Sequence, residues 1–366
     1  MIRSPHPLYR PHELAFRTQY AELKERSCSM ARLLPGSPGS LVRRAGTGRA
    51  YWYRVYQTAA GVQVEDLICK DGDDQALALA QTGIEFAQWA AAQVRHLRKL
   101  DFQVADKGVA SVLAGLHNSG LLAAAGLSVV GTLGYAAWLN ELGAHAISAS
   151  TQDIDLAARQ RLLLAAPLSF QDTVQATRLG FVPVPGLAAQ APSTSLKRLG
   201  RDGLRIDMLA HGKTLGAIVP VPALMWHAQT VPHYDYLLSQ PRQAAILAGG
   251  HCIPVLLPQP VRFMWHKFYS SATRQSFPEK ADKDMRQAAT LAAILVEQQD
   301  EDLGESLAGL PAAMATVLRS RLPAFLRLLA AHASTSQALG QALARPQARQ
   351  PPSVAAPPCH PAPASR

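Results

Sequence analysis

The sequence predicts an α+β protein in which a small mixed sheet is flanked by helices. Three features of the 366 residues indicate this class. The middle third alternates short apolar runs, typical of strands, with segments of helical spacing. The first third combines a hairpin pattern with long helical segments, which predicts a separate N-terminal α/β module. After Pro258 the chain turns helical, which predicts a C-terminal helical region.

Four segments follow from these changes in pattern. We expect an N-terminal module of helices and a hairpin over residues 1–120, a core over 121–257 and a helical region over 258–335. A Pro/Ala-rich tail follows over 336–366, and the last 21 residues contain seven prolines. Such a composition has little apolar surface to bury, so we expect the tail to be disordered and to take no part in function.

The N-terminal module is predicted to begin with a helix over 11–34, which ends at the loop "LLPGSPGS". "AYWYRVYQTAAGVQVEDLICK" reads as two strands of a hairpin. Asp74 is a candidate cap for a long helix that runs to about Leu100, and another helix is expected over about 107–117.

The core is predicted to have β-α-β-α-β order. The expected elements are strand "LSVVG", a helix from Thr132 to Leu142, strand "QDIDLA", a helix from a Ser169 cap to Gly180, and strand "LRIDML". The 19 uncharged residues 121–139 reach the length of a membrane span. Three glycines interrupt them, so a buried strand followed by a buried helix is the preferred interpretation.

Three helices are predicted beyond the core. The first is "PQPVRFMWHKFYSSATR", with Pro260 in its first turn, and the second is "PEKADKDMRQAATLAAILVEQQ". The third extends from Pro311 to about His332.

The chain is basic, with a net charge of +10 and a pI near 9.7. This balance favours polyanionic partners such as nucleotides or RNA, although charge for solubility alone would produce it too. The four cysteines show no metal-binding spacing, and they are typical of reduced thiols. The N-terminus lacks the apolar run of a signal peptide. We therefore expect a cytoplasmic protein without membrane association.

Two aspartates separated by one residue suggest a metal site. On a strand, Asp153 and Asp155 would project from the same face while Ile154 points to the core. Like charges that close repel unless a cation or proton joins them. Mg²⁺ or Mn²⁺ would resolve this repulsion and would hold phosphate oxygens as well. The alternative is an ordinary strand end or cap.

Two further features strengthen the metal interpretation. Gly131 and Thr132 lie between a strand and a helix, where backbone N–H groups can bind phosphate; an ordinary capped turn is the alternative. Asp207 lies among apolar residues of "LRIDML", where an unpaired carboxylate would be costly. The alternative for Asp207 is a salt bridge with Arg205.

Taken together, these motifs resemble the nucleotidyltransferase fold of the polymerase-β type. The stretches "GTLGYAAWLNELG", "TQDIDLA", "STSLKRLGRDGLRIDML" and "PQPVRFMWHKFYSSATR" with "EKADKDMRQA" are similar to a bacterial group of such proteins, distant relatives of abortive-infection nucleotidyltransferase toxins. The resemblance extends over roughly residues 126–300. The chain departs from the pattern at Gly131-Thr132, where Gly-Gly or Gly-Ser is usual, and it lacks the arginine before Thr-x-Asp.

The resemblance implies specific roles. Asp153, Asp155 and Asp207 would hold Mg²⁺ or Mn²⁺, and Asp207 would also be a possible base for the acceptor hydroxyl. Gly131 and Thr132 match the phosphate loop, and Lys267 matches the helix lysine. The basic stretch contains Arg274, Lys280, Lys283 and Asp284. A solvated helix face is the alternative for the three lysines.

Other polar and aromatic residues carry weaker expectations. Lys197 and Arg198 are placed in a loop that could contact nucleotide, although a surface loop is as good an interpretation. Tyr135 and Trp138 are expected in the core. The histidines His211, His227, His233, His251 and His266 lack metal spacing and are expected to be ordinary core or surface residues.

The sequence is compatible with three functions. The leading hypothesis is a metal-dependent nucleotidyltransferase that moves a nucleoside monophosphate from a nucleoside triphosphate (NTP) to a hydroxyl of an RNA, a protein or a small molecule. The alternative is a non-catalytic nucleotide- or RNA-binding module on the same fold. A protein-interaction scaffold is the third, supported only by the long N-terminal helix.

Overall fold

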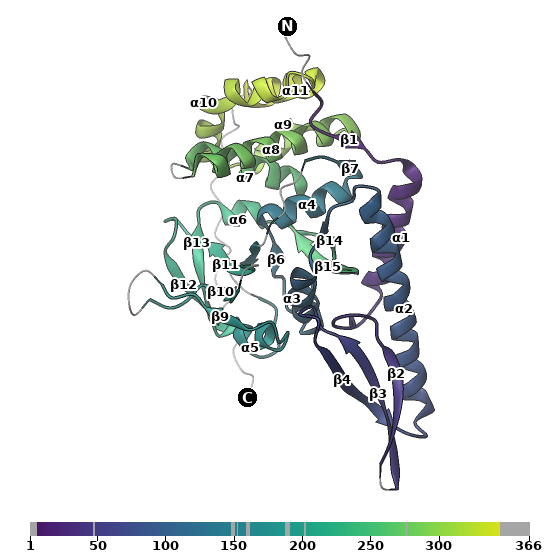
Figure 1. Ribbon diagram of the computed structural model, residues 1–366. Coiled ribbons are helices and arrows are strands. Elements are labelled where there is room, and N and C mark those ends of the chain that lie inside the picture. Colours follow the sequence, from purple (N-terminus) through teal and green to yellow (C-terminus); the bar gives the residue numbers. More distant parts are fainter. Residues whose placement is uncertain are drawn as a thin grey trace, which may run out of the picture.

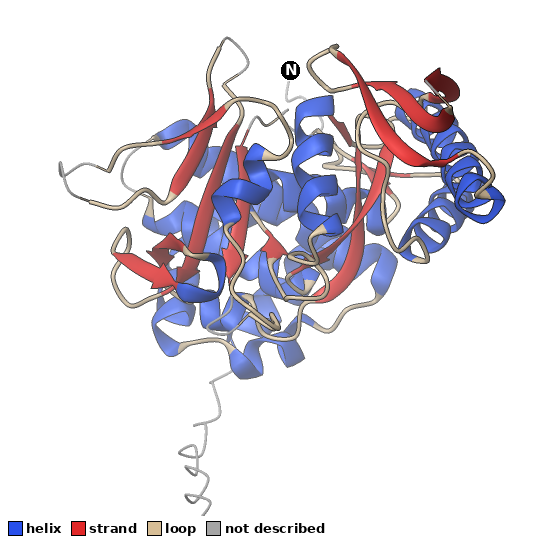
Figure 2. Ribbon diagram, turned by 90° about the horizontal axis from the view of Figure 1, so that it is seen from below, coloured by secondary structure: helices blue, strands red, loops and turns tan. Residues whose placement is uncertain are grey.

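The computed structural model describes residues 6–46, 48–147, 151, 153–158, 162–186, 191–200, 203–274 and 277–344. The protein is α+β, with a large mixed sheet, a separate three-stranded sheet and helices at one end (Figure 1). Figure 2 shows the strands of the main sheet running between helices, with the small sheet set apart at the edge of the molecule.

The N-terminal module consists of a projecting three-stranded sheet, the arm, and two helices that pack against the large sheet (Figure 1). It contains α1 (Leu14–Cys28), β2 (Ser40–Gly46), β3 (Arg49–Gln57), β4 (Gln63–Lys70) and α2 (Asp74–Lys99). The predicted hairpin is confirmed as β3–β4. Strand β2 was missed because its run of mostly exposed residues, including two arginines, lacks apolar alternation. The first helix is shorter than 11–34, and β1 (Arg10–Pro11) pairs with β7 (Ala144–His145) instead.

The cap of α2 is also one residue earlier than expected. The Asp73 carboxylate accepts a hydrogen bond from the Ala76 N–H at 3.1 Å, and Asp74 is the first helical residue. An N-cap residue must keep non-helical backbone angles, as Asp73 does.

The predicted core elements are present. They are β6 (Ser128–Val129), α4 (Gly131–Glu141), β8 (Asp153–Ala158), α5 (Phe170–Gln175) and β11 (Arg205–His211). The helix expected over about 107–117 as part of the N-terminal module is α3 (Lys107–Asn118), and its buried residues belong to the same apolar core as these elements. Ser169 caps α5 as expected, but the helix ends five residues before Gly180 because a turn with left-handed Arg178 follows it. Gln152, the first residue of the predicted strand "QDIDLA", lies outside the described residues.

The main sheet is mixed, and it is larger than expected. In the described part of the chain it contains ten strands, in the order β12-β13-β11-β8-β6-β15-β14-β5, with β10 paired to β11 and β9 paired to β10. The strands not yet given are β5 (Val104–Ala105), β9 (Phe181–Pro183), β10 (Ser195–Arg198), β12 (Ile218–Val221), β13 (Trp226–Val231), β14 (Arg242–Ala248) and β15 (His251–Leu257). The predicted loop around Lys197 and Arg198 is wrong, because these residues pair antiparallel with β11 and β9.

Helices cover one end of this sheet. They are α7 (Pro260–Thr273), α8 (Pro278–Gln299), α9 (Leu303–Ser306), α10 (Ala312–Leu328) and α11 (Ala333–Ala344), while α6 (Tyr234–Leu237) precedes β14. Within the described chain no helix is long and apolar enough to cross a membrane. The uncharged stretch 121–139 forms β6 and α4, as predicted.

The prediction of a disordered tail over 336–366 is wrong for residues 336–344. Residues 336–344 belong to α11, which buries Leu339, Ala342 and Leu343 against α8, α9 and α10. This helix has apolar residues three and four positions apart, a spacing that the proline-rich composition downstream obscured. Residues 345–366 lie outside the described residues.

Candidate active site

Strands β8 and β11 bring the three aspartates together. The two strands pair in parallel, with Asp155 opposite Asp207 and Asp153 opposite Arg205. Because directly opposed residues of a parallel pair share a sheet face, the side chains of Asp155 and Asp207 lie on one side of the sheet. The prediction that these aspartates occupy adjacent strands is confirmed.

The turn between β6 and α4 brings a helix N-terminus against Asp155. The Val130 N–H donates a hydrogen bond to the Asp155 carbonyl oxygen at 2.9 Å. Gly131 has φ +66°, and a Cβ built on it would lie 1.8 Å from Asp155 Oδ2. Only glycine combines this left-handed conformation with so close an approach. The first N–H groups of α4 therefore face the carboxylate region, where an anion could bind.

Asp155 is an unusual carboxylate. Burial raises its pKa to about 6, and the neighbouring Asp207 and Asp153 add to the rise, while Lys267 and Lys283 oppose it. No hydrogen bond or ion pair to its carboxylate oxygens is found among the described residues. A buried carboxylate without a partner in the protein is stabilised by binding a proton or a cation from solution.

Asp207, in contrast, already has partners. Arg205 Nε lies 2.7 Å from Asp207 Oδ1, and the Ser195 hydroxyl donates a short hydrogen bond to the same oxygen. The Arg205 guanidinium also donates to Ser195 Oγ at 2.9 Å. The alternative raised from the sequence, a salt bridge with Arg205, is thus present.

A ready-made three-ligand metal site is not seen. In the part of the chain that the structure describes, no group of three or more His, Cys, Asp or Glu side chains is arranged to hold a metal ion. Asp153 is exposed at the start of β8, and Asp207 faces Arg205. The residues fit Mg²⁺ in another way, since this ion is usually held by one or two protein carboxylates together with substrate phosphates.

The predicted cations of α7 and α8 fall into two groups. Lys267 is only 6% exposed and its Nζ lies 3.0 Å from Asp284 Oδ1, while Arg274 lies 3.2 Å from Asp284 Oδ2. A solvated helix face is therefore wrong for Lys267. Lys283 donates to Thr132 Oγ1 at 3.0 Å, which ties α8 to the first turn of α4. Burial lowers the pKa of Lys283.

Lys280 is placed differently. Its side chain is exposed, and its Nζ lies 5.3 Å from the centre of the Phe277 ring.

A cavity lies beside Asp155, and we call it the Asp155 pocket; its volume is about 690 Å³. Of the predicted residues, Gly131, Asp155, Lys267, Arg274 and Asp284 line it. The other predicted residues lie outside its lining: Thr132, Asp153, Asp207, Lys280 and Lys283. Sequence reasoning missed most of its apolar and aromatic wall, which includes Tyr234, Phe263, His266 and Tyr269. Three of these four lie with Lys267 on one face of α7 at spacings of three or four residues, so the helical period was the signal that could have identified them.

His266 is a wall residue without a charge. It is buried, and burial lowers its pKa to about 4, so the ring is neutral near pH 7. Its Nε2 lies 3.3 Å from the Pro232 carbonyl oxygen. Tyr135 and Trp138 are buried core residues, as expected.

Comparison with known proteins identifies the class. Residues 107–310 match the sequence model of a protein family described as Nucleotidyltransferase. This match covers more than half of the 366 residues, and the chain belongs to this nucleotidyltransferase family. The N-terminal arm precedes the matched region.

A solved structure shows a more distant similarity. It is an antigenic nucleotidyltransferase-like protein from Paracoccidioides brasiliensis, 12% identical to this chain, with a TM-score of 0.29. The alignment covers 58% of this chain and 91% of that chain. No curated protein matches the chain.

Proposed function

We propose that this protein is a metal-dependent nucleotidyltransferase that transfers a nucleoside monophosphate from an NTP to a hydroxyl of an RNA, a protein or a small molecule. Membership of the nucleotidyltransferase family supports the general reaction. The observation that carries the assignment to this pocket is the contact between Gly131 and Asp155. It sets a helix N-terminus, which favours phosphate, against a carboxylate that lacks a counter-ion.

Asp153 and Asp155 are the proposed ligands of Mg²⁺ or Mn²⁺, completed by oxygens of the bound triphosphate. When bound, such an ion withdraws electrons from the phosphorus and stabilises charge on the transferring group. Asp207 would orient the acceptor hydroxyl and accept its proton, once the acceptor displaces Arg205 from the carboxylate. The acceptor oxygen then bonds to the α-phosphorus, and pyrophosphate leaves.

The triphosphate is proposed to bind between α4 and α8. The N–H groups at the start of α4 and the Thr132 hydroxyl face one side, and Lys283 contributes positive charge from the other. Lys267 and Arg274 share Asp284, so they supply less free charge than Lys283. Their proposed role is to hold α7 and α8 together and to add positive potential to the pocket.

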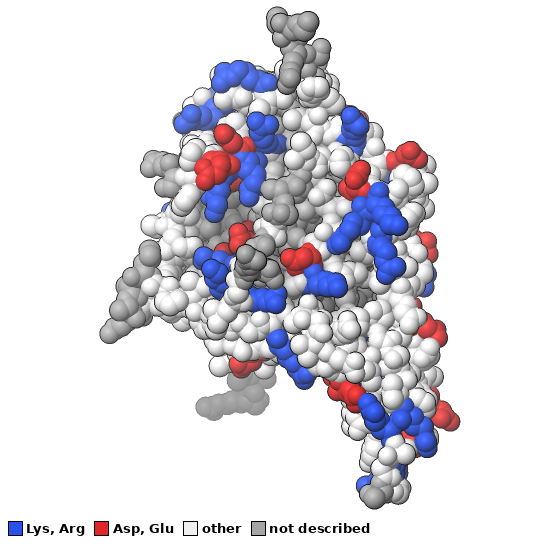
Figure 3. Space-filling view, viewed as in Figure 1, with Lys and Arg blue, Asp and Glu red and all other residues white. Residues whose placement is uncertain are grey.

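The surface charge of the protein bears on the class of acceptor. In Figure 3, the basic side chains on the face shown are interspersed with acidic ones rather than gathered in one patch. The excess of positive charge favours RNA, and a cytoplasmic location fits an RNA or protein acceptor. The resemblance to abortive-infection toxins stays a prediction.

The test is transfer of label from each α-³²P-NTP, with Mg²⁺ or Mn²⁺, to total RNA and to total protein. We expect one triphosphate to label one acceptor class, and Asp153→Asn and Asp155→Asn to abolish labelling while both variants remain folded. Asp207→Asn should lower the rate strongly and leave NTP binding intact. Labelling at the wild-type rate by both Asp153→Asn and Asp155→Asn would refute the metal mechanism.

The ion pair between Arg205 and Asp207 favours the second candidate, a non-catalytic nucleotide- or RNA-binding module. In that case the protein would bind an NTP in calorimetry, and no acceptor would be labelled with either metal. Arg205→Gln separates the two functions. It frees Asp207, the proposed base, and should raise turnover in an enzyme, whereas a binding module would label no acceptor with or without this change.

A further inference from the structure

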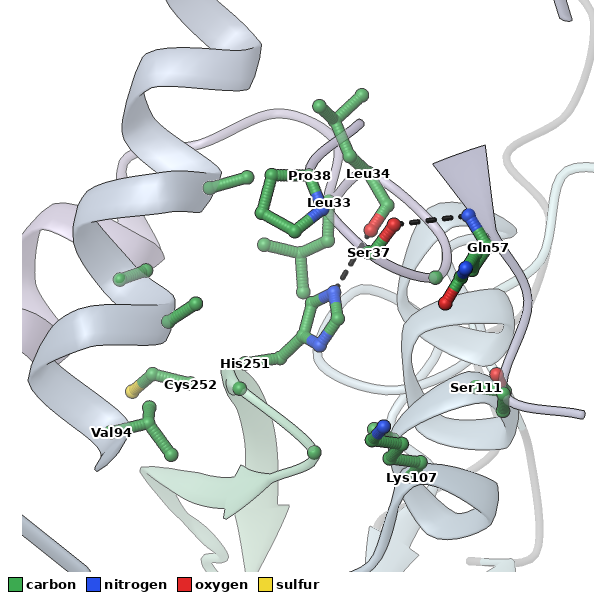
Figure 4. A pocket seen from close by; sticks show the side chains of 18 of the residues that line it. Leu33, Leu34, Ser37, Pro38, Gln57, Val94, Lys107, Ser111, His251 and Cys252 are labelled. Atoms are coloured by element: carbon green, nitrogen blue, oxygen red, sulfur yellow. Dashed lines mark hydrogen bonds between the residues drawn. The ribbon is translucent and has the colours of Figure 1, made fainter. Parts of the chain in front are cut away.

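A second cavity lies between the arm and the core. Its volume is about 610 Å³, and among the described residues it shares no lining side chain with the Asp155 pocket. Its walls come from α2, from the loop that follows α1, from the start of α3 and from the turn between β14 and β15. Figure 4 shows Leu34 and Pro38 above the His251 ring, Val94 on one side and Lys107 on the other. We call it the α2 pocket.

One face of α2 lines the pocket with apolar residues at one end and arginines at the other. Phe86, Ala87, Ala90, Ala91 and Val94 line its apolar part. Arg95 and Arg98 continue the same face at the C-terminal end of the helix. With a rise of 1.5 Å per residue, Phe86 and Arg98 are separated by about 18 Å along the helix axis. The pocket is therefore elongated, with an apolar end and a cationic end.

The cations at this pocket are not neutralised by the protein. Arg32, Arg95, Arg98 and Lys107 line it, and none of them forms an ion pair with a described residue. The acidic residue in the lining is Asp106, whose carboxylate accepts the Val109 N–H at 2.9 Å as the cap of α3. Four positive charges against one carboxylate that is already in use favour an anionic ligand.

Two buried polar atoms in the lining also lack partners. His251 Nε2 lies 2.9 Å from the Leu34 carbonyl oxygen, so Nε2 carries the proton and donates it. His251 Nδ1 is then an acceptor, and it has no partner among the described residues. Ser27 Oγ, 1% exposed as a residue, has none either. Both residues line the pocket, and buried polar atoms are normally hydrogen-bonded, so their lack of partners marks this wall as a candidate ligand contact.

We propose that the α2 pocket binds a small amphipathic anion, with its apolar body along α2 and its acidic group between Arg95, Arg98 and Lys107. The volume lies in the range of small-molecule sites, and the lining matches their pattern of apolar walls with few polar groups. The chain's own residues 345–366 are an unsuitable occupant, because they contain three arginines and no acidic residue.

The probe for this proposal is dodecanoate, titrated into the full-length protein by calorimetry below its micelle concentration. Methyl dodecanoate and dodecylammonium have the same chain without the negative charge. We expect saturable 1:1 binding of dodecanoate, and binding at least tenfold weaker for the other two. Equal binding of all three would overturn the proposal, since the cationic end would then contribute nothing.

Two test variants, each with its own control, assign the binding to this pocket. Ala87→Trp fills the apolar part, and Gln88→Trp adds the same side chain to the next, exposed position of α2. Arg95→Gln with Arg98→Gln removes two rim charges, and Arg321→Gln, exposed on α10, is the charge control. We expect Ala87→Trp to abolish binding, the double variant to weaken it about tenfold, and both controls to bind like wild type.

Melting temperatures show whether each variant is folded. If folded Ala87→Trp binds dodecanoate as wild type does, the site is elsewhere and the proposal fails. If Ala87→Trp does not fold, the Arg95→Gln/Arg98→Gln pair decides, and wild-type affinity in that variant also overturns the proposal. NTP binding is measured in parallel; the α2 pocket variants should leave it unchanged, which keeps this test independent of the proposed enzyme activity.

Discussion

Lys283 of α8 donates a hydrogen bond of 3.0 Å to the hydroxyl of Thr132, at the first turn of α4. The two residues are 151 positions apart in the chain, and the bond joins α8 to α4, the helix whose first residue, Gly131, lines the Asp155 pocket. It keeps an ammonium group beside a helix N-terminus, where it would meet phosphate oxygens.

Replacing Lys283 should therefore weaken the binding of the triphosphate. For Lys283→Met we expect a rise of about tenfold in KM or Kd for the NTP, because one charge-assisted contact is lost. Thr132→Ala should be milder, since the backbone N–H groups remain. Lys280→Met is the matched control on the same helix and should behave like wild type. Nucleotide affinity is measured by calorimetry, and equal effects at positions 280 and 283 would contradict this placement.

Gly131→Ala should be far more destabilising than a typical glycine substitution. Its Cβ would collide with Asp155 Oδ2, and the φ of +66° is unfavourable for alanine. We expect a loss of more than about 3 kcal/mol in the free energy of unfolding. Gly120→Ala is the control, because Gly120 has φ +75° and nothing within 4 Å, so it should cost only about 1 kcal/mol.

A double-mutant cycle isolates the collision. In an Asp155→Ala background, Gly131→Ala should cost about as much as Gly120→Ala does. If the cost stays the same in both backgrounds, the close approach of Gly131 to Asp155 is not the cause.

Asp155 should make the stability depend on pH. Its pKa is about 6 in the folded protein and 3.8 in an unconstrained chain, so the folded state holds the proton more tightly. This contribution to stability is fully present below about pH 4 and is lost as the pH rises to about 6. Asp155→Asn should remove this loss, and at pH 7.5 it should raise the free energy of unfolding by on the order of 1–2 kcal/mol.

The measurement is urea unfolding of wild type and Asp155→Asn between pH 4 and 8 without metal. Asp153→Asn is the control, since Asp153 is exposed and should change stability by less than about 0.5 kcal/mol. Added Mg²⁺ with an NTP should stabilise wild type and not Asp155→Asn. Parallel pH curves for the two proteins would contradict the assignment.

Lys267→Met should destabilise the fold. It leaves the buried Asp284 with Arg274 alone, and removing one partner of a buried ion pair costs about 3 kcal/mol. Lys267→Met with Asp284→Asn should recover part of this loss, because no buried charge is left unpaired. Chemical denaturation measures both. A double variant less stable than Lys267→Met would show that Asp284 has a different structural role.

Truncation separates α11 from the tail. Ending the chain after Ala344 should leave the melting temperature within about 1 °C of wild type. Ending it after His332 removes α11 and its buried Leu339 and Leu343, which should cost at least about 3 kcal/mol. Calorimetry of the two truncated proteins checks this, and similar melting temperatures would show that α11 contributes little.

The sequence by itself determined the local elements of the site. The order of strand, Gly131-Thr132 and helix, the placement of Asp153 and Asp155 on one strand, and the placement of Asp207 on another follow from periodicity and capping, which depend on residues near each other in the chain. The Ser169 cap and the helices that begin at Pro260 and Pro278 follow for the same reason.

Only the tertiary structure decided which groups meet. The ladder between β8 and β11 sets Asp155 opposite Asp207, packing of α8 against α4 brings Lys283 to Thr132, and the β14–β15 hairpin completes the main sheet. Lys267 forms a buried ion pair with Asp284, whereas the alternative interpretation of the sequence placed it on a solvated helix face. Such contacts join residues far apart in sequence, and they form because burying apolar faces selects one packing of helices and strands, which no local pattern specifies.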